Sequence, residues 1–328
     1  MSRRAVIQGI GHAVPDRVLT NFDIAELVDT NDEWIRQRTG IRERRICSPG
    51  EASGSLAITA SKEAIHRSSV AADQIDLVVC GTVTGDMLFP STACIVQHAV
   101  GATNAGAFDL GAACAGFICS LSVAGAMIES GQIKTALVIG VDTLSRYVDW
   151  TDRSTCILFG DGAGAVVMKA EEDTDRGLIR TVLLSDGGGG HHIQLEVGGS
   201  LRPFGTPEAE GHRKYVFMNG AEVYRFAVNA MGDACCKALD LAGMDTSQID
   251  LFVPHQANLR IIESAAKRLG LPDEKVLVNV DRYGNTSGGS IPLGLYEAEV
   301  TGRLKRGDVV MTVGFGAGLV WGANLIRW

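Results

Sequence analysis

An internal repeat constrains the fold of this 328-residue chain more than any other feature. Residues 72–79 read Ala-Asp-Gln-Ile-Asp-Leu-Val-Val, and residues 246–253 read Thr-Ser-Gln-Ile-Asp-Leu-Phe-Val. Residues 137–140 likewise match residues 311–314, and both pairs are 174 positions apart (246 − 72 = 174; 311 − 137 = 174). Two matches at one offset predict a duplicated unit of strands and helices.

Apolar runs and helical periodicity within this repeat predict an α/β protein. The expected strands are residues 5–10, 75–81, 135–140, 165–168, 249–253, 275–280, 309–313 and 320–327. The expected helices are residues 55–69, 91–100, 115–130, 218–241 and 259–269, with a shorter helix that Asn21 or Asp23 caps and that runs through Val28. A charged break at residues 171–176 divides the chain into an N-terminal half, 1–172, and a C-terminal half, 173–328.

Composition narrows the class of protein. The net charge of −8 argues against general affinity for nucleic acid or anionic membrane. Eight cysteines without a C-x-x-C pair favour reduced thiols in a cytosol over a disulfide framework or a zinc site. The N-terminus lacks a signal-peptide pattern, and no apolar run is long enough to span a bilayer, so a cytoplasmic location is expected.

The segment around Cys114 places a thiol at a strand-to-helix turn. It begins as an apolar strand at Phe108, passes Gly111 and continues after Cys114 as a mostly apolar helix. Unpaired N–H groups and the helix dipole at such a position favour the thiolate, which is the nucleophilic form of cysteine. The same N–H groups can hold the oxyanion that nucleophilic attack creates. The alternative is a structural cysteine that behaves as a small buried hydrophobe.

The second half of the chain supplies polar partners for this thiol. Under the 174-residue offset Cys114 corresponds to Gly288, in the segment that also carries Asn285. The two turns are therefore expected to face each other across a pseudo-two-fold axis, each opening a central helix. His255 stands between a strand and a helix, a frequent place for active-site residues in α/β proteins. A neutral histidine and an asparagine that donate toward one point stabilise an enolate or thioester oxyanion, whereas the alternatives are a structural histidine and an Asx-turn.

A tryptophan among arginines is a second candidate binding feature. Trp34 and Arg38 lie in a run of five arginines between residues 30 and 45. Such a run is often a solvated face. Its alternative is a site for a phosphate-bearing ligand, in which the indole stacks on a base and an arginine pairs with phosphate.

A long glycine- and proline-bearing segment at residues 187–211 is expected to be a functional lid or a mobile loop. It contains the adjacent histidines His191 and His192. Without further ligands at fixed spacing they do not predict a metal site.

Five segments together resemble the β-ketoacyl-acyl-carrier-protein synthase III family of condensing enzymes. Three carry the candidate polar residues: Asp109-Leu-Gly-Ala-Ala-Cys114-Ala-Gly-Phe, Pro254-His255-Gln-Ala-Asn-Leu-Arg and Tyr283-Gly-Asn285-Thr-Ser. The others are residues 32–44 and 158–165, and the likeness extends over essentially the whole chain in the family's order. The resemblance implies the thiolase-like fold, a five-layered αβαβα arrangement of two duplicated halves, which agrees with the repeat.

The resemblance also implies an acyltransferase that initiates fatty-acid biosynthesis. Cys114 is expected to take the acyl group from a short acyl-CoA. His255 and Asn285 are expected to stabilise the enolate that forms as malonyl-acyl carrier protein loses carbon dioxide. The enolate then attacks the acyl-cysteine in a decarboxylative Claisen condensation. The implied protein is a cytosolic homodimer that needs no metal or cofactor, since the CoA thioester is itself a substrate.

Binding roles follow from the same resemblance. The acyl oxygen is expected on backbone N–H groups near Cys114, Gly316 and Ala317, with Phe315 in the pocket. Expected CoA contacts are Thr30, Trp34, Arg38, Arg153 and Asn258. A basic patch for the acidic carrier protein is expected at Arg260, Lys267 and Arg268, whose i, i+7, i+8 spacing places them on one helix face.

Two departures from the family pattern bear on specificity. Many members have alanines where this chain has Gly288 and Gly289. The glycines are expected to loosen the turn or to enlarge the space facing the thiol. Phe89 matches a phenylalanine that closes the acyl pocket of the partner subunit, but Met87 and Leu88 precede it. The sequence leaves open whether the primer is acetyl, branched or longer.

Three other functions remain as alternatives. A secondary-metabolite condensing enzyme or acyltransferase keeps the fold and changes the acceptor. A thiol hydrolase also uses cysteine, histidine and asparagine, but the apolar helix after Cys114 and the CoA-type motifs have no role in proteolysis. An inactive binding subunit is disfavoured because all three polar residues are present.

Overall fold

The computed structural model describes residues 3–328, and its larger sheet belongs to the N-terminal half. The strand order is β1-β7-β6-β4-β5, with β4 parallel to β5 and β6, and with β7 antiparallel to β6 and β1. The bounds are β1 (Arg3–Ala13), β4 (Leu77–Gly81), β5 (Gly106–Leu110), β6 (Thr135–Thr143) and β7 (Asp161–Glu172). Strands β4 and β6 are buried along their whole length, which explains why their sequences are continuous apolar runs.

A second sheet repeats this arrangement in the C-terminal half. Its order is β11-β12-β13-β8, with β11 parallel to β12 and the other pairs antiparallel. The bounds are β8 (Gly177–Ser185), β11 (Leu251–Pro254), β12 (Val309–Gly316) and β13 (Val320–Arg327). The proposed boundary between residues 172 and 173 falls in the connection from β7 to β8.

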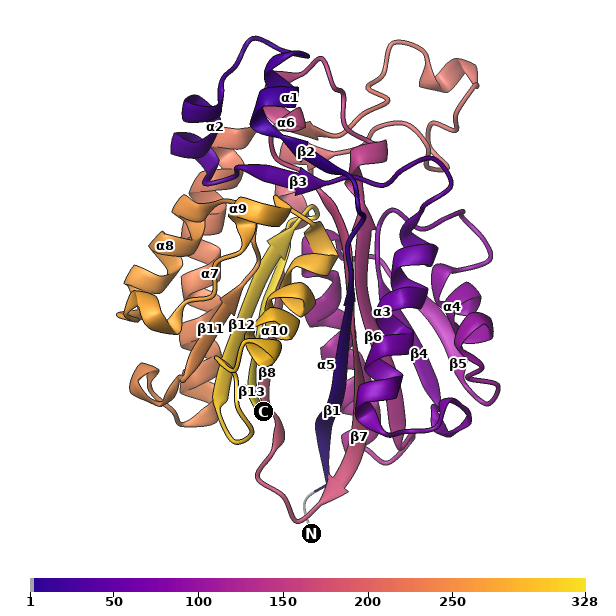
Figure 1. Ribbon diagram of the computed structural model, residues 1–328, viewed down its shortest axis with the longest axis vertical. Coiled ribbons are helices and arrows are strands. Elements are labelled where there is room, and N and C mark those ends of the chain that lie inside the picture. The colour runs from indigo at the N-terminus through magenta and orange to yellow at the C-terminus, as the bar shows by residue number, and fades with distance from the viewer. Residues whose placement is uncertain (1–2) are drawn as a thin grey trace.

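Helices separate and cover the two sheets (Figure 1). Helix α3 (Ser53–Ser68) and α4 (Thr92–Val100) pack on the outer face of the first sheet, and α7 (Gly220–Ala242) packs on the outer face of the second, with α8 (Leu259–Leu269) beside it. Helices α5 (Gly116–Glu129) and α10 (Ser290–Val300) lie between the sheets and contact both. The resulting αβαβα order is the predicted one, and it explains why α5 is apolar nearly all round.

The 174-residue offset extends over most secondary structure. It relates the first residues of β1 and β8 (177 − 3), β4 and β11 (251 − 77), and β6 and β12 (309 − 135). It also relates the last residues of α3 and α7 (242 − 68). After β12 the correspondence ends, because residues 144–160 connect β6 to β7 whereas only residues 317–319 connect β12 to β13.

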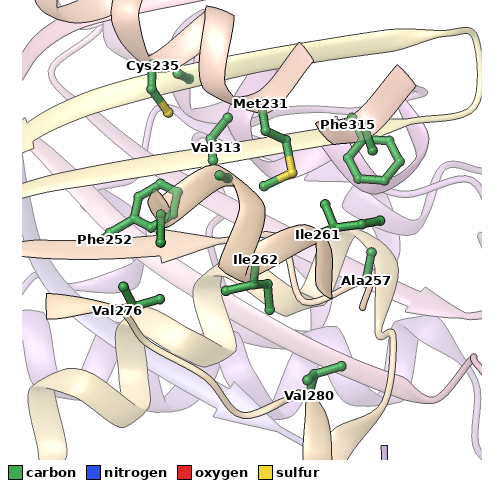
Figure 2. Packing of buried hydrophobic residues seen from close by; sticks show 14 of the residues in the cluster. Met231, Cys235, Phe252, Ala257, Ile261, Ile262, Val276, Val280, Val313 and Phe315 are labelled. Atoms are coloured by element: carbon green, nitrogen blue, oxygen red, sulfur yellow. The ribbon is translucent and has the colours of Figure 1, made fainter. Parts of the chain in front are cut away.

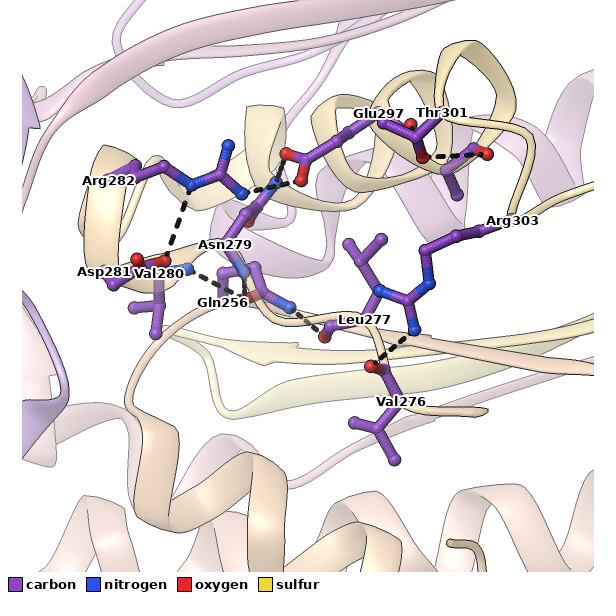
Figure 3. A network of polar contacts seen from close by, with 11 residues as sticks. Gln256, Val276, Leu277, Asn279, Val280, Asp281, Arg282, Glu297, Thr301 and Arg303 are labelled. Carbon is purple, nitrogen blue, oxygen red and sulfur yellow. Dashed lines mark hydrogen bonds and ion pairs between the residues drawn. The ribbon is translucent and has the colours of Figure 1, made fainter. Parts of the chain in front are cut away.

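The strand predicted at residues 275–280 is wrong. At the position corresponding to β5 the second half has the short helix α9 (Val280–Tyr283), and Val276 makes only an isolated bridge to Phe252. The buried side chain of Gln256 takes up the backbone groups that a strand would use (Figure 3). Its Oε1 accepts the N–H groups of Asn279 (2.9 Å) and Val280 (3.1 Å), and its Nε2 donates to the Leu277 carbonyl (3.1 Å).

The main core of the second half lies between α7, α8 and the sheet (Figure 2). Helix α8 buries Ile261, Ile262, Ala265, Ala266 and Leu269, the stripe expected from its amphipathic sequence. Met231 of α7, Phe252 of β11 and Phe315 of β12 pack in the same cluster. Phe315 thus links this core to the end of β12.

A small N-terminal subassembly lies at the top of Figure 1, where β2 (Val18–Thr20), β3 (Glu43–Arg45), α1 (Asn21–Ala25), α2 (Asp32–Thr39) and α6 (Arg153–Cys156) meet. Thr20, rather than the predicted Asn21 or Asp23, is the N-cap of α1, and the helix ends before Val28. Asp23 completes a capping box with Thr20.

A fully buried arginine ties this subassembly to the rest of the chain. The Arg44 guanidinium donates to the Leu19 carbonyl (3.2 Å), to Asn21 Oδ1 (2.9 Å) and to the Ile157 carbonyl (2.7 Å). Burial lowers the pKa of Arg44 to about 10, so the group remains charged at neutral pH.

The segment at residues 187–211 contains short 3-10 turns and β9 (Ile193–Gln194), which pairs with β10 (Phe217–Met218). Its outer part projects at the top right of Figure 1. Across residues 3–328, no helix has both the length and the apolar character that crossing a bilayer requires.

Candidate active site

A cavity of about 880 Å³ lies where the ends of β5, β11 and β12 meet, and its walls are mainly apolar. It brings together most of the predicted site residues from both halves: Trp34, Arg38, Cys114, His255, Asn258, Arg260, Asn285, Phe315, Gly316 and Ala317. Thr30, Phe89, Arg153, Lys267 and Arg268 are not among the described residues that line it. The segment after residue 187 contributes Ile193, Gln194 and Leu195 to the wall.

Cys114 lies in a 3-10 turn (Ala113–Ala115) between β5 and α5. The turn is tight, because Ala113 has a φ of 45° and Ala115 N–H already donates to the Ala112 carbonyl (3.0 Å). Gly316 approaches this turn so closely that a Cβ atom there would lie 2.6 Å from the Cys114 nitrogen. The backbone N–H of Cys114 belongs to the opening turn of the helix, where donors have no intrahelical acceptor.

The expected stabilisation of the Cys114 thiolate is outweighed in the structure. Burial raises the pKa of the thiol to about 12; the nearby Ser287 hydroxyl opposes this increase, and the Asp142 carboxylate adds to it. Sequence reasoning considered only the helix terminus and not the burial of the site. The resting group is therefore a neutral thiol, and its proton must leave as it attacks.

His255 stands directly after β11 and is 1% exposed. Its backbone N–H donates to the Val313 carbonyl (2.7 Å), and its Nδ1 lies 2.6 Å from Ser290 Oγ. Burial lowers the pKa of the imidazole to about 3, so the ring is neutral at physiological pH. The Nε2 atom has no hydrogen-bond partner anywhere in residues 3–328.

Asn285 precedes a second 3-10 turn (Ser287–Gly289) that opens α10. Its backbone bonds to Leu158 and Gly160 (2.9 and 3.0 Å), and its Oδ1 accepts the Ser287 N–H (2.9 Å). With Oδ1 engaged inside the loop, the Nδ2 amide is left as the donor for the cavity. Ser287 has a φ of 49°, close to that of Ala113, which lies 174 residues earlier.

Phe315 packs at the end of β12 against the site histidine. Its ring meets the His255 ring edge-to-face with centroids 5.7 Å apart, and Phe226 contacts its other side. Figure 2 shows Phe315 beside Met231 and Ile261. These ring contacts contribute to the burial of the imidazole.

Trp34 marks the part of the cavity that α2 borders, so it is not merely part of a solvated face. The guanidinium groups of Arg38 and Arg153 lie 5.1 and 5.0 Å from the centre of its ring. Stacked groups contact at about 3.5–4 Å, so an adenine between Trp34 and Arg153 requires the arginine to move outward. Asn258 Nδ2 donates to the Arg38 carbonyl (3.0 Å), and its Oδ1 caps α8.

The three basic residues predicted on α8 differ in their surroundings. Arg260 lies over the ring of Tyr224, 5.2 Å from its centre, and also lines the cavity. Arg268 forms an ion pair with Asp233 of α7, whereas Lys267 is exposed. The positive charge of Arg268 is therefore partly compensated within the protein.

The structure adds three polar residues that sequence reasoning missed. They are Ser290 next to His255, Gln256 in the loop network of Figure 3, and the buried Asp142. The signal that could have found Ser290 and Asp142 is the repeat itself, because each has a glycine 174 residues away. For the region that the structure describes, no group of three or more histidine, cysteine, aspartate or glutamate side chains is arranged to hold a metal ion.

Comparisons with known proteins identify the family. Residues 108–187 match the model of 3-oxoacyl-[acyl-carrier-protein (ACP)] synthase III, and residues 239–328 match the model of its C-terminal part. The β-ketoacyl-[acyl-carrier-protein] synthase III of Symbiobacterium thermophilum is 53% identical over 98% of this chain and 97% of its own length.

Solved structures of similar proteins support the same family. The 3-oxoacyl-[acyl-carrier-protein] synthase III of Aquifex aeolicus superposes with a TM-score of 0.92 at 42% identity, covering 99% of this chain and 100% of its own. The priming β-ketosynthase from the R1128 polyketide biosynthetic pathway gives the same TM-score at 36% identity, with 99% and 96% covered. These matches confirm the thiolase-like fold. The chain belongs to the β-ketoacyl-[acyl-carrier-protein] synthase III family and is a condensing acyltransferase.

Proposed function

We propose that this enzyme joins a short acyl group from acyl-CoA to the two-carbon unit of malonyl-acyl carrier protein, through an acyl thioester on Cys114. The observation that carries the proposal is the convergence of one thiol, one neutral imidazole and one amide in a single apolar cavity. The thiol sulfur attacks the thioester carbonyl, the CoA sulfur leaves, and the proton of the cysteine goes to the leaving sulfur. Backbone N–H groups of the Cys114 turn and of residues 316–317 hold the oxyanion.

In the second half-reaction the enolate is the species to be stabilised. Malonyl thioester loses carbon dioxide, and the negative charge moves to its carbonyl oxygen. His255 Nε2 and Asn285 Nδ2 are the cavity-facing groups that can donate to this oxygen. The enolate carbon then attacks the acyl-cysteine carbonyl, a carbon–carbon bond forms, and the Cys114 sulfur leaves and takes a proton.

The mouth near Trp34 is the proposed CoA entrance. Trp34 and Arg153 hold the adenine, while Thr30, Arg38 and Asn258 contact the rest of the nucleotide and its arm. Thr30 Oγ1 is buried without a hydrogen-bond partner in residues 3–328, which suits a ligand contact. The basic residues Arg260, Lys267 and Arg268 form the proposed docking patch for the acidic carrier protein.

We also propose a cytoplasmic homodimer that requires no cofactor. Phe89 is 83% exposed and Leu88 is 86% exposed, which is unusual for apolar side chains on a monomer. A partner subunit that receives Phe89 in its acyl pocket accounts for this exposure.

The test separates the two half-reactions. Wild-type protein, C114S and H255A are incubated with radioactive acetyl-CoA, and malonyl-carrier protein decarboxylation is followed separately. C114S should lose labelling, whereas H255A should keep labelling and lose decarboxylation. Labelling of C114S at the wild-type level would refute the acyl-cysteine, and equal loss of both steps in H255A would make the histidine the base for the thiol.

A secondary-metabolite condensing enzyme is the second candidate, and the similarity to the R1128 priming ketosynthase favours it. Condensation rates with carrier proteins of fatty-acid and polyketide synthesis, across a panel of acyl-CoA primers, distinguish the two. Intact mass of the acyl-Cys114 adduct identifies the accepted primers.

A further inference from the structure

Five side chains near the pseudo-two-fold axis share an unexpected property. Each of the five has a glycine at the corresponding position of the other half, 174 residues away. The pairs are Cys114 and Gly288, Asn285 and Gly111, His255 and Gly81, Ser290 and Gly116, and Asp142 and Gly316. Four of these side chains belong to the proposed site or support it. The fifth, Asp142, has no role in the proposed reaction so far.

Several of these glycines lie in close packing at the pseudo-two-fold axis. A Cβ atom at Gly81 would lie 2.5 Å from the carbonyl carbon of Gly116, and one at Gly288 would lie 3.1 Å from the Gly81 oxygen. Gly111, in contrast, has open space around it and borders the cavity. Close backbone packing therefore accounts for the glycines at 81 and 316, where an added Cβ atom would lie 2.5 Å and 2.6 Å from backbone atoms, but not for Gly111.

Asp142 lies at the end of β6 and is completely buried. Its Oδ2 accepts the backbone N–H of Gly288 (3.0 Å), in the turn that carries Asn285. Its Oδ1 accepts Thr82 Oγ1 (3.1 Å), Val83 N–H (3.0 Å) and Thr84 Oγ1 (2.8 Å). One carboxylate thus joins the Asn285 turn of the second half to a cavity wall of the first, since Val83 and Thr84 line the cavity.

The corresponding place in the other half is the Cys114 turn. Under the 174-residue offset, Gly288 corresponds to Cys114 and Asp142 corresponds to Gly316. The Asp142 carboxylate accepts the Gly288 N–H. The position that corresponds to this carboxylate is therefore the space between Gly316 and the Cys114 N–H. In one half that position holds a permanent carboxylate oxygen. In the other half the missing side chain leaves it free for the oxyanion of the substrate.

We propose that Asp142 is a positioning residue of the condensing site, whose carboxylate fixes the Ser287–Gly288 turn and thereby holds the Asn285 amide opposite Cys114. The proposal rests on the proposed function for the role of Asn285. Since Asp142 acts through the turn, its loss should affect decarboxylation more than acylation. Its negative charge beside Cys114 also disfavours the thiolate, so its removal should make the thiol more reactive.

The experiment uses the full-length protein with D142N, which keeps the shape and removes the charge. The matched control is D161N. Asp161 is also completely buried at a strand end, and its carboxylate accepts hydrogen bonds from Cys47 and Ser145 and, among the described residues, from neither turn. The readouts are the rates of acetyl-Cys114 formation and malonyl-carrier protein decarboxylation, and the rate at which iodoacetamide alkylates Cys114 at pH 8, followed by peptide mass mapping.

In D142N the ratio of decarboxylation to acylation should fall roughly tenfold, as expected for the loss of one well-placed donor, and Cys114 alkylation should become several-fold faster. D161N should leave both readouts at the wild-type value even where it lowers stability. If D142N leaves the ratio of decarboxylation to acylation at the wild-type value, Asp142 is merely structural and the proposal is overturned, whatever the alkylation rate.

Two arrangements keep the result interpretable. Should D142N not fold, D142S removes the charge while leaving room for water at the Gly288 N–H. D142S should then lower the ratio of decarboxylation to acylation, and an unchanged ratio overturns the proposal. The alkylation readout does not depend on the substrates. A wild-type protein that performs no condensation, but whose Cys114 alkylation still responds to D142N, would refute the proposed function and not the contact between Asp142 and the site.

Discussion

The Nδ1 atom of His255 lies 2.6 Å from the hydroxyl oxygen of Ser290, and this contact determines which ring nitrogen carries the proton. Ser290 Oγ also accepts the backbone N–H of Gln256 (3.4 Å), and within residues 3–328 the hydroxyl has no acceptor other than Nδ1, to which it donates. The neutral ring then carries its proton on Nε2, the atom without a partner in the described chain. His255 is therefore arranged as a donor toward the cavity.

Replacing Ser290 with alanine should weaken this arrangement. We expect S290A to reduce the rate of malonyl-carrier protein decarboxylation about tenfold, since one hydrogen bond of roughly 1 kcal/mol orients the ring, and to leave acylation of Cys114 nearly unchanged. The matched control is S122A, because Ser122 bonds to Ile118 on the companion helix α5. A loss of acylation equal to that of decarboxylation would contradict this role of Ser290.

Acid stability should report the neutral state of His255. Its pKa is about 3 in the folded protein, against about 6.5 in an unfolded chain, so the unfolded state binds more protons between these values. The free energy of unfolding should therefore fall as the pH decreases from 6.5, by up to about 1.4 kcal/mol per pH unit from this residue alone. Urea unfolding of wild type and H255N at pH 7, 6 and 5 measures it; a slope as steep in H255N as in wild type would disprove the assignment.

Alkylation of Cys114 should rise steeply with pH. Because the pKa of the half-buried Cys114 thiol is raised to about 12, the thiolate fraction and the alkylation rate should increase roughly tenfold per pH unit from pH 7 to 9, without a plateau. Peptide mass mapping after brief iodoacetamide treatment measures this rate, and the exposed Cys94 provides the comparison within the same sample. A plateau below pH 8 would mean that the helix terminus prevails over burial.

Among the arginines, replacement of Arg44 should decrease the free energy of unfolding most. Its side chain is buried and donates to three oxygens, so R44M leaves three buried acceptors without their donor, each costing about 1 kcal/mol or more. We expect the free energy of unfolding to decrease by about 3 kcal/mol or more in urea titrations. R42M, at the exposed Arg42 nearby, should stay within about 0.5 kcal/mol of wild type.

Phe89 should affect catalysis without affecting the stability of the single chain. Phe89 is exposed and contributes little to the hydrophobic core of its own subunit, so F89A should have the same free energy of unfolding as wild type at low protein concentration. If it closes a partner's acyl pocket, F89A should shift the preference for acyl-CoA chain length in kcat/KM. An unchanged preference together with an unchanged dimer would exclude Phe89 from the pocket.

The repeat was readable from the sequence because buried strands keep an apolar pattern through duplication. The two matched segments became β4 with β11 and β6 with β12. The false strand at residues 275–280 had the same apolar character, but Gln256 occupies its backbone groups from a position some 20 residues earlier. A side chain that competes with a sheet ladder leaves no local signal.

The site was predicted in its parts but not in its electrostatics. Cys114, His255 and Asn285 were found as motifs, and the fold brings them to one cavity. The expected thiolate was wrong for the resting enzyme, because burial and the carboxylate of Asp142 act on the sulfur through space. Such effects depend on distances that the order of residues does not contain. The partner-dependent role of Phe89 stays a prediction for the same reason.

The pairing of each site residue with a glycine has a consequence for how this enzyme can evolve. An ancestral duplication provided two equivalent turns at the axis, and either could have become the reactive one. In this chain one turn carries the thiol of Cys114 and its twin carries Gly288, so the two copies are no longer interchangeable. At Gly81 and Gly316 an added Cβ atom would lie 2.5 Å and 2.6 Å from backbone atoms, so neither position accepts a side chain unless the backbone shifts. Making the two halves alike again would abolish the site rather than double it.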